Sequence, residues 1–262
     1  MRVVPFLFLG CALVCAASAT AVAGGQVTPS ADDAAGQRRL PVLTADVGDA
    51  ASFGRTLRWL GVMQADVALD PVCDPSLTTS GTTQATRCVV ALPAPQTSYF
   101  QHDAVVRIRL PANASHSLLC PWLSPYLRAT YANPNPPGGA AVVGRLSVRP
   151  TLTIDNAALS APGLVDPNTD APLAGRLTIP LTATETLELP LPADTRVVRH
   201  ERDSSVCIAG ISRRLLTTSY GLSAAQADAF FANPMTVGLD IGGSLQYIED
   251  GWLTFGLRLI GD

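Results

Sequence analysis

The stretch LRWLGVMQADVALD, residues 57–70, decides the fold class of this chain. Every odd position in it is non-polar. The even positions include four polar residues: Arg58, Gln64, Asp66 and Asp70. Alternation with a period of two over this length is typical of a β-strand that buries one face. Trp59 lies on the non-polar face, and we expect it in the core. Phe53, Leu57 and Leu60 also fit the spacing of a helix, so the start of the element stays open.

Three more stretches alternate in the same way, at residues 105–110, 145–154 and 176–184. Their non-polar faces carry Val106, Ile108 and Leu110; Leu146, Val148, Leu152 and Ile154; and Leu177, Ile179, Leu181 and Ala183. Pro150 and Pro180 interrupt two of these runs. Because proline has no N–H to donate to a sheet ladder, we expect an edge strand, a bulge or a strand break at both positions.

The last two apolar runs, residues 244–249 and 252–260, flank Asp250 and Gly251. Asp-Gly is a preferred two-residue turn, so the sequence predicts a C-terminal β-hairpin. One face of its second strand carries four large non-polar side chains: Leu253, Phe255, Leu257 and Leu259. Trp252 lies on the opposite face of that strand.

One segment favours a helix. Ser223 and Gln226 have the spacing of a capping box, and residues 224–232 favour helix. Phe230 and Phe231 are expected to dock this helix on a sheet. The whole pattern predicts a mainly β chain, an antiparallel β-sandwich or barrel-like domain with one short helix.

The N-terminal region predicts a secretory signal peptide. Arg2 precedes an apolar run, and the Ala-Val-Ala sequence at 21–23 has the small-x-small pattern of a cleavage site. We therefore expect three parts: a signal peptide at 1–23, a flexible leader at 24–46, and a β-rich domain at 47–262, as one body or two packed halves. The loop at 133–139, rich in Asn, Pro and Gly, is the candidate hinge for two halves.

A lipid anchor on Cys11 is an alternative to cleavage after Ala23. Gly10 precedes this cysteine suitably, but Phe8 stands where lipoprotein signals usually carry leucine. No later segment has the roughly 20 apolar residues that a membrane-spanning helix needs. The sequence therefore predicts an exported protein, located in the periplasm, on the cell surface or outside the cell.

Cysteines support the same compartment. Four remain after the predicted cleavage site, and an even number in an exported chain favours disulfides. Cys73 and Cys88 flank a hydrophilic stretch, so a bridge between them would close the base of a loop. The remaining pair would then be Cys120 and Cys207, which lie far apart in the sequence.

Charge and composition exclude several kinds of chemistry. The chain has 18 basic and 21 acidic residues, a net charge of −3, which gives no indication of a nucleic-acid partner. All 18 basic residues are arginine. Without lysine, the chain has no lysine nucleophile, no Schiff-base lysine and no P-loop lysine.

Residue patterns for catalysis are incomplete. His102, His116 and His200 share no spacing typical of a metal site. Glu201 follows His200 as in H-E-x-x-H, but Ser204 stands in place of the second histidine. The sequence also contains no G-x-S-x-G motif for a serine hydrolase. We therefore assign no catalytic residue.

One loop has features of a metal site. Asp166, Asn168 and Asp170 place oxygen-bearing side chains at alternate positions, as in the first half of a calcium-binding loop. Ala171 replaces the turn glycine of an EF-hand, and Leu177 stands at the position of its bidentate glutamate. Asp and Asn are also ordinary turn formers, so a turn and a calcium site remain the two interpretations.

Aromatic residues near the C-terminus suggest a binding surface. Trp252, Tyr247 and Arg258 are the candidate binding residues, on the solvent face of the predicted hairpin. The first hypothesis is an exported, non-catalytic β-rich protein for binding, adhesion or envelope structure. Its partner would be a glycan or another envelope or surface protein. The alternative is a secreted or periplasmic hydrolase whose catalytic residues are dispersed in the sequence.

Overall fold

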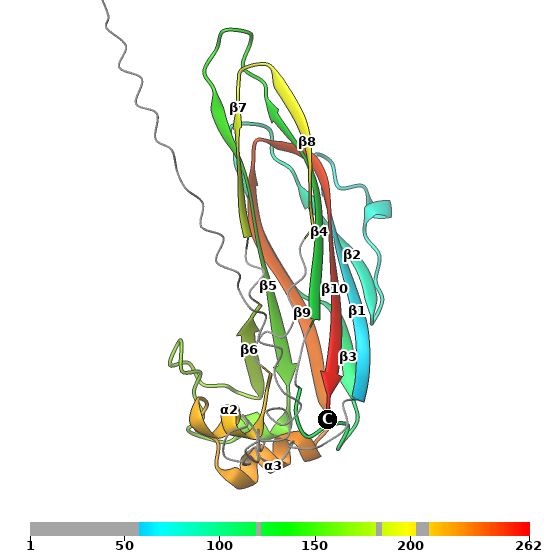
Figure 1. Cartoon of the computed structure of the whole chain (residues 1–262), viewed down its shortest axis with the longest axis vertical. Coiled ribbons are helices and arrows are strands. Elements are labelled where there is room, and N and C mark those ends of the chain that lie inside the picture. The colour runs from blue at the N-terminus through cyan, green and yellow to red at the C-terminus, as the bar shows by residue number, and fades with distance from the viewer. Residues whose placement is uncertain (1–57, 119–121, 182–184, 203–209) are drawn as a thin grey trace, which may run out of the picture. The chain divides into compact units, whose positions relative to one another are not determined.

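The computed structural model describes residues 58–118, 122–181, 185–202 and 210–262. Two β-sheets pack face to face and form a β-sandwich (Figure 1). The first sheet contains, in spatial order, β2 (Gln84–Val90), β1 (Arg58–Asp70), β10 (Ile248–Gly261), β4 (Trp122–Asn133) and β8 (Thr195–Arg202). The second contains β3 (Thr97–Leu110), β9 (Met235–Gln246), β5 (Val142–Asp155) and β6 (Arg176–Pro180), with β7 (Glu185–Leu191) also paired to β5. The predicted fold class is confirmed.

Neighbouring strands pair antiparallel throughout the described part of the chain, except for β1 and β2, which run parallel. The alternating stretch at residues 57–70 forms the strand β1, as predicted. Four odd residues of β1 are fully or almost fully buried: Met63, Ala65, Val67 and Leu69. In the antiparallel register Ala65 lies opposite Phe255, so the core side chains of β1 and β10 are neighbours.

Short helices close one end of the sandwich (Figure 1). The predicted helix is α3 (Ala224–Ala232), with a complete capping box between Ser223 and Gln226. Phe230 and Phe231 are buried as expected and pack edge to face. A second helix, α2 (Arg213–Thr218), was not predicted, since six residues are too few to establish a helical period. Two 3₁₀ turns, η2 (Pro75–Leu77) and η3 (Ala157–Ser160), complete the helical elements among the described residues.

Pro150 does not interrupt its own strand, contrary to the prediction, because β5 pairs with β9 without a break through this residue. On one side of β5, the pairing with β7 ends at Val148 and the pairing with β6 begins at Thr151. The C=O of Pro150 accepts a hydrogen bond from the N–H of Leu181 at 3.1 Å on that side. The missing N–H of proline therefore falls where the partner strand changes.

The prediction that Trp59 lies in the core is wrong. Its surface is 60% exposed, and the register between β1 and β10 shifts between Trp59 and Gly61. Trp59 pairs with Ile260 and Gly61 with Leu259, so Leu60 is an extra residue in β1. A β-bulge of this kind reverses the faces of the residues that precede it.

The predicted C-terminal hairpin is also wrong. The strands β9 and β10 belong to different sheets, and the chain passes between the sheets at Tyr247, which has a φ of 58°. Gly251 lies within β10, paired with both Leu69 and Ala129. A Cβ atom there would lie 2.7 Å from the carbonyl oxygen of Arg128, so this glycine allows close strand packing and does not form a turn.

We expect the inner face of β10 to carry a large share of the stability. Phe255 is fully buried, and Phe255→Ala should lower the free energy of unfolding by about 3–5 kcal/mol. Val62 is 49% exposed on the outer face of β1, and Val62→Ala should change it by less than about 0.5 kcal/mol. Urea unfolding of both variants measures the difference, and equal losses would contradict this account of the core.

Candidate functional site

The three predicted binding residues do not form one site. Trp252 and Arg258 share the outer face of β10, but they lie six positions apart, which is about 20 Å along a strand. Trp252 is partly exposed and Arg258 is exposed. Tyr247 lies where the chain crosses from β9 to β10, and it lines a groove whose other residues include 90–94 and 248–250. The three residues therefore belong to two separate surfaces, the outer face of β10 and the groove at Tyr247.

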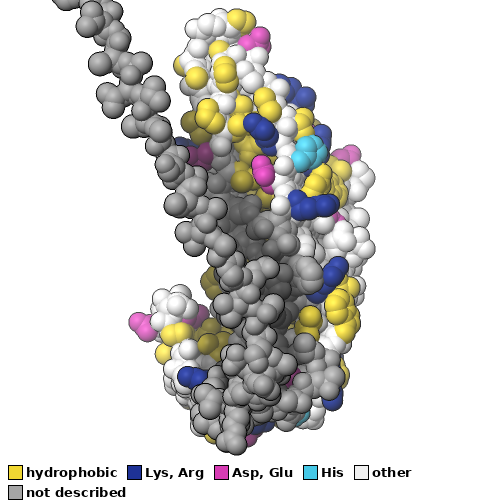
Figure 2. Space-filling model, in the orientation of Figure 1, with side chains coloured by type: hydrophobic (Ala, Val, Ile, Leu, Met, Phe, Trp, Pro, Cys, Tyr) yellow, Lys and Arg dark blue, Asp and Glu magenta, His cyan; other side chains and the backbone are white. Residues whose placement is uncertain are grey.

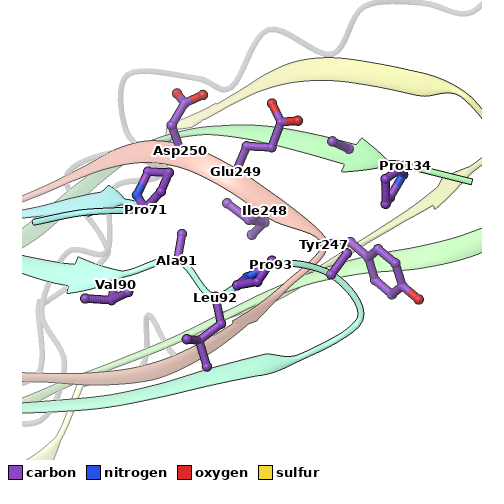
Figure 3. Close-up of a pocket in the computed structure, with 12 residues that line it drawn as sticks. Pro71, Val90, Ala91, Leu92, Pro93, Pro134, Tyr247, Ile248, Glu249 and Asp250 are labelled. Carbon is purple, nitrogen blue, oxygen red and sulfur yellow. The ribbon is translucent and has the colours of Figure 1, made fainter.

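The groove at Tyr247 has a volume of about 870 Å³. One wall is the end of β2 and the segment after it, from Val90 to Ala94, and the other is the start of β10, from Ile248 to Asp250 (Figure 3). Pro71 and Pro134 add to a lining that is mostly apolar, with Glu249 and Asp250 as its charged residues. Val90 is 44% exposed and Leu92 is 39% exposed, so large apolar side chains are accessible from solvent.

The groove opens where β1 and β2 both end and only β10 continues, to Ile248. On one side, the last bond of β1 is from the N–H of Ala91 to the C=O of Asp70, at 3.0 Å. On the other side, the last pair is Leu69 with Gly251. Asp70 pairs with Val90, the last residue of β2, so beyond that level the groove lies between β10 and the irregular segment 91–94. Where β1 still lies between them, β2 and β10 are separated by two inter-strand spacings, about 10 Å.

Local interactions turn the chain out of the sheet after Asp70. Pro71 cannot donate a ladder hydrogen bond. The Asp70 carboxylate accepts hydrogen bonds from the N–H groups of Val72, at 2.9 Å, and Cys73, at 3.2 Å. Cys73 has a φ of 52° and forms a disulfide with Cys88 of β2. These interactions fix the exit of β1 and thereby keep the end of the groove open.

The predicted Cys73–Cys88 disulfide is confirmed, with a Cα–Cα distance of 5.6 Å. The predicted partners Cys120 and Cys207 lie outside the described residues.

The acidic rim of the groove is neutralised by arginines. Arg196 lies 2.6 Å from Glu249 and 3.3 Å from Asp250. Asp250 also contacts Arg128 at 3.3 Å and accepts a hydrogen bond from the hydroxyl of Thr130 at 3.0 Å. Figure 3 shows both carboxylates pointing to the side opposite Val90 and Leu92. The groove therefore offers apolar surface to a ligand, with its nearest charges already paired.

The candidate calcium loop is held as a turn. The Asp166 carboxylate accepts a hydrogen bond from the N–H of Asn168 at 2.8 Å, and the C=O of Asp166 accepts one from the N–H of Asp170 at 2.8 Å. Asp170 has a φ of 54°. These contacts match the turn interpretation of the sequence. Within the described ranges, no three His, Cys, Asp or Glu residues converge as metal ligands.

The three histidines lie on separate elements. His102 is in β3, His116 precedes β4, and His200 is in β8. Burial lowers the pKa of His102, and the nearby charge of Arg87 lowers it further. No histidine ring forms a hydrogen bond to a serine hydroxyl or a carboxylate among the bonds of the described residues; the ring of His200 contacts the Tyr126 hydroxyl. Among the described residues, the three histidines therefore form no Ser-His-Asp triad.

Asp240 of β9 is a buried carboxylate with a structural task. It accepts a hydrogen bond from the N–H of Ala104 at 2.6 Å, and the hydroxyl of Thr153 lies 3.3 Å away. Ala104 has a φ of 44° and lies in the bulge of β3 opposite Asp240. Burial raises the pKa of Asp240 above its ordinary value, and the charge of Asp103 adds to the rise. The carboxylate therefore fixes the bulge at a cost in desolvation.

Comparisons with known proteins do not identify a family. No family model matches the sequence, and no curated protein matches it. A chain from the structure of infectious bursal disease virus, Gx strain, is 11% identical, with a TM-score of 0.17. The match covers 71% of this chain and 41% of the viral chain, so this chain spans about two fifths of it. A similarity this low carries no argument about fold or function.

No helix among the residues with described structure has the length and apolarity needed to cross a membrane.

Removing the disulfide should loosen the exit of β1. We expect Cys73→Ala/Cys88→Ala to lower the free energy of unfolding by about 3 kcal/mol, because the bridge closes a loop with a sequence separation of 15 residues. Chemical denaturation of the double variant measures this without touching Cys120 or Cys207. A variant as stable as the wild type would show that the bridge does not constrain this loop.

Asp240 should make stability depend on pH. Its folded-state pKa is raised, so the wild type loses stability as pH rises from the unfolded value, about 3.9, through the folded value. Asp240→Asn keeps an acceptor oxygen for Ala104 but does not titrate. We therefore expect this variant to gain stability relative to the wild type between pH 4 and pH 7. Urea unfolding at pH 4 and at pH 7 measures the difference in unfolding free energy between the variant and the wild type. If that difference is the same at both pH values, Asp240 does not have a raised pKa.

Proposed function

We propose that this chain is an exported, non-catalytic binding protein of the adhesion or envelope-associated class. The signal-like pattern of residues 1–23 supports export, and a disulfide is compatible with an oxidising compartment. The observation that carries the binding function is the apolar groove of about 870 Å³ between the end of β2 and the start of β10. Its volume falls within the range of about 300–1,000 Å³ that is usual for ligand sites.

The partner that fits this groove is an extended apolar segment of another envelope or surface protein. The groove continues the line of β1, which up to Asp70 occupies, as one extended chain, the two inter-strand spacings, about 10 Å, between β2 and β10. An extended segment that alternates apolar and polar residues would place every second side chain on the apolar lining. The paired state of Glu249 and Asp250 favours a segment without charge at its centre.

Substitutions in the groove wall test this proposal. A library of displayed decapeptides selected on the wild type should yield sequences in which apolar residues alternate. For the selected peptides, Val90→Glu and Leu92→Glu should weaken binding at least tenfold, about 1.4 kcal/mol, as measured by fluorescence anisotropy. Val143→Glu is the matched control, because Val143 of β5 is 37% exposed and lies outside the groove.

Two results would overturn the proposal. Equal binding of the selected peptides to Leu92→Glu and to the wild type would remove the groove as the site. Turnover of ester, glycoside or peptide substrates that is lost on changing one His, Asp or Glu would establish the hydrolase alternative.

A further inference from the structure

A second surface lies on the outer face of the first sheet, where basic and aromatic side chains from three strands meet. We call it the β4–β8 patch, and it consists of Tyr126 and Arg128 of β4, His200 and Arg202 of β8, and Trp252 of β10. The strand register makes these residues neighbours. Arg128 lies opposite Trp252 on one side and His200 on the other, and Tyr126 lies opposite Arg202. None of the five lines the apolar groove.

Contacts within the patch hold the side chains in place. The Tyr126 hydroxyl lies 2.9 Å from Nδ1 of His200. The Arg202 guanidinium carbon lies 5.7 Å from the centroid of the Tyr126 ring, within the range of a cation–π interaction. Arg128 is held by its ion pair with Asp250 at 3.3 Å. A ligand would therefore meet basic groups whose positions are partly fixed before binding.

The patch is positive although the whole chain has a net charge of −3. Figure 2 shows dark blue basic side chains and a histidine gathered over the region of β4 and β8. The nearby carboxylates of Glu249 and Asp250 both contact Arg196, which neutralises one of their two charges. Arg128 neutralises the second, and Arg202 and His200 form no ion pair with a carboxylate among the described residues.

We propose that the β4–β8 patch binds an anionic polysaccharide, a linear glycan with carboxylate or sulfate groups. Arginine binds such planar or tetrahedral anions through paired N–H groups, and the Tyr126 and Trp252 rings offer apolar faces for sugar rings. The patch is an open sheet face that crosses three strands, so it can contact several sugar units of a linear polysaccharide. Nucleic acid fits less well, because phosphate backbones are bound through many unpaired cationic contacts, and this patch has few.

Three probes test the proposal at 150 mM salt: heparin as the sulfated polymer, polygalacturonate as the carboxylated polymer and dextran as the uncharged polymer. The wild-type protein should bind at least one of the two anionic polymers and not dextran in isothermal titration calorimetry. Binding should weaken as salt is raised, since surface charge contacts are screened. Binding to neither anionic polymer, or equal binding to dextran, would overturn the proposal.

Substitutions on the two faces of β8 locate the site. Arg202→Gln and Trp252→Leu should each reduce binding of the anionic polymer at least fivefold. Arg199→Gln is the control, because it removes the same charge from the same strand. Arg199 precedes His200 in β8 and therefore lies on the other face of the sheet, outside the patch, so its effect on binding should be below twofold. Circular dichroism confirms that each variant is folded, and Tyr126→Phe, which removes only the hydroxyl, is a second test if Trp252→Leu does not fold.

The outcomes of these substitutions are distinct. Equal losses for Arg202→Gln and Arg199→Gln would indicate attraction by total charge and would overturn the assignment to the patch. Tighter binding of single-stranded DNA than of either polysaccharide, in the same buffer, would overturn the ligand class. Neither result bears on the apolar groove, whose peptide binding is measured with other variants.

Discussion

The pairing of β10 with β1 on one side and with β4 on the other organises the first sheet. Leu253 lies between Val67 and Leu127, and all three side chains are buried. The central strand therefore joins two segments that lie far apart in the sequence, and it supplies the middle of the core. Both candidate surfaces are defined by its neighbours: the groove lies at the level where β1 leaves it, and the β4–β8 patch lies on its outer face with β4 and β8.

The groove depends on where one strand stops. The antiparallel strand β10 continues past Asp70 to Ile248, whereas β2 ends at Val90, opposite Asp70. Pro71 and the disulfide at Cys73 direct the chain out of the sheet. A longer β1 would fill the same space with its own side chains and backbone. The apolar cavity is therefore a consequence of a local termination signal, and the stability of the loop and the shape of the groove are physically linked.

Strand positions could be predicted from the sequence, because the alternation in β1 and β5 reports which side chains are buried. The same holds for the capping box of α3 and for the disulfide across a short loop. Which sheet a strand joins is not encoded in that alternation. Asp250 and Gly251 have the local signature of a turn, yet the pairing of β10 with β1 and β4 keeps them extended. A single extra residue at Leu60 likewise reverses the face of Trp59.

The candidate sites were harder to predict than the fold, because each combines segments that are distant in the sequence. The sequence predicts Trp252 as a candidate binding residue, but Tyr126, His200 and Arg202 become its neighbours only through the strand order β10-β4-β8. The proline at position 71, which cannot donate a ladder hydrogen bond, is a local sequence signal for the end of β1, but it does not predict a groove.

The buried carboxylates help to separate structural from functional polar groups. Asp240 binds the N–H of Ala104 in the bulge of β3, and Asp66 accepts hydrogen bonds from Thr254 at 2.6 Å and Gln64 at 3.0 Å. Each carboxylate thus satisfies groups that the strand pairing leaves next to it, which is what low-dielectric surroundings require of a buried charge. Arg202 of the β4–β8 patch differs from them, because it is exposed and rests on an aromatic ring. A cation in that position contributes little to the fold and remains available to an anionic partner.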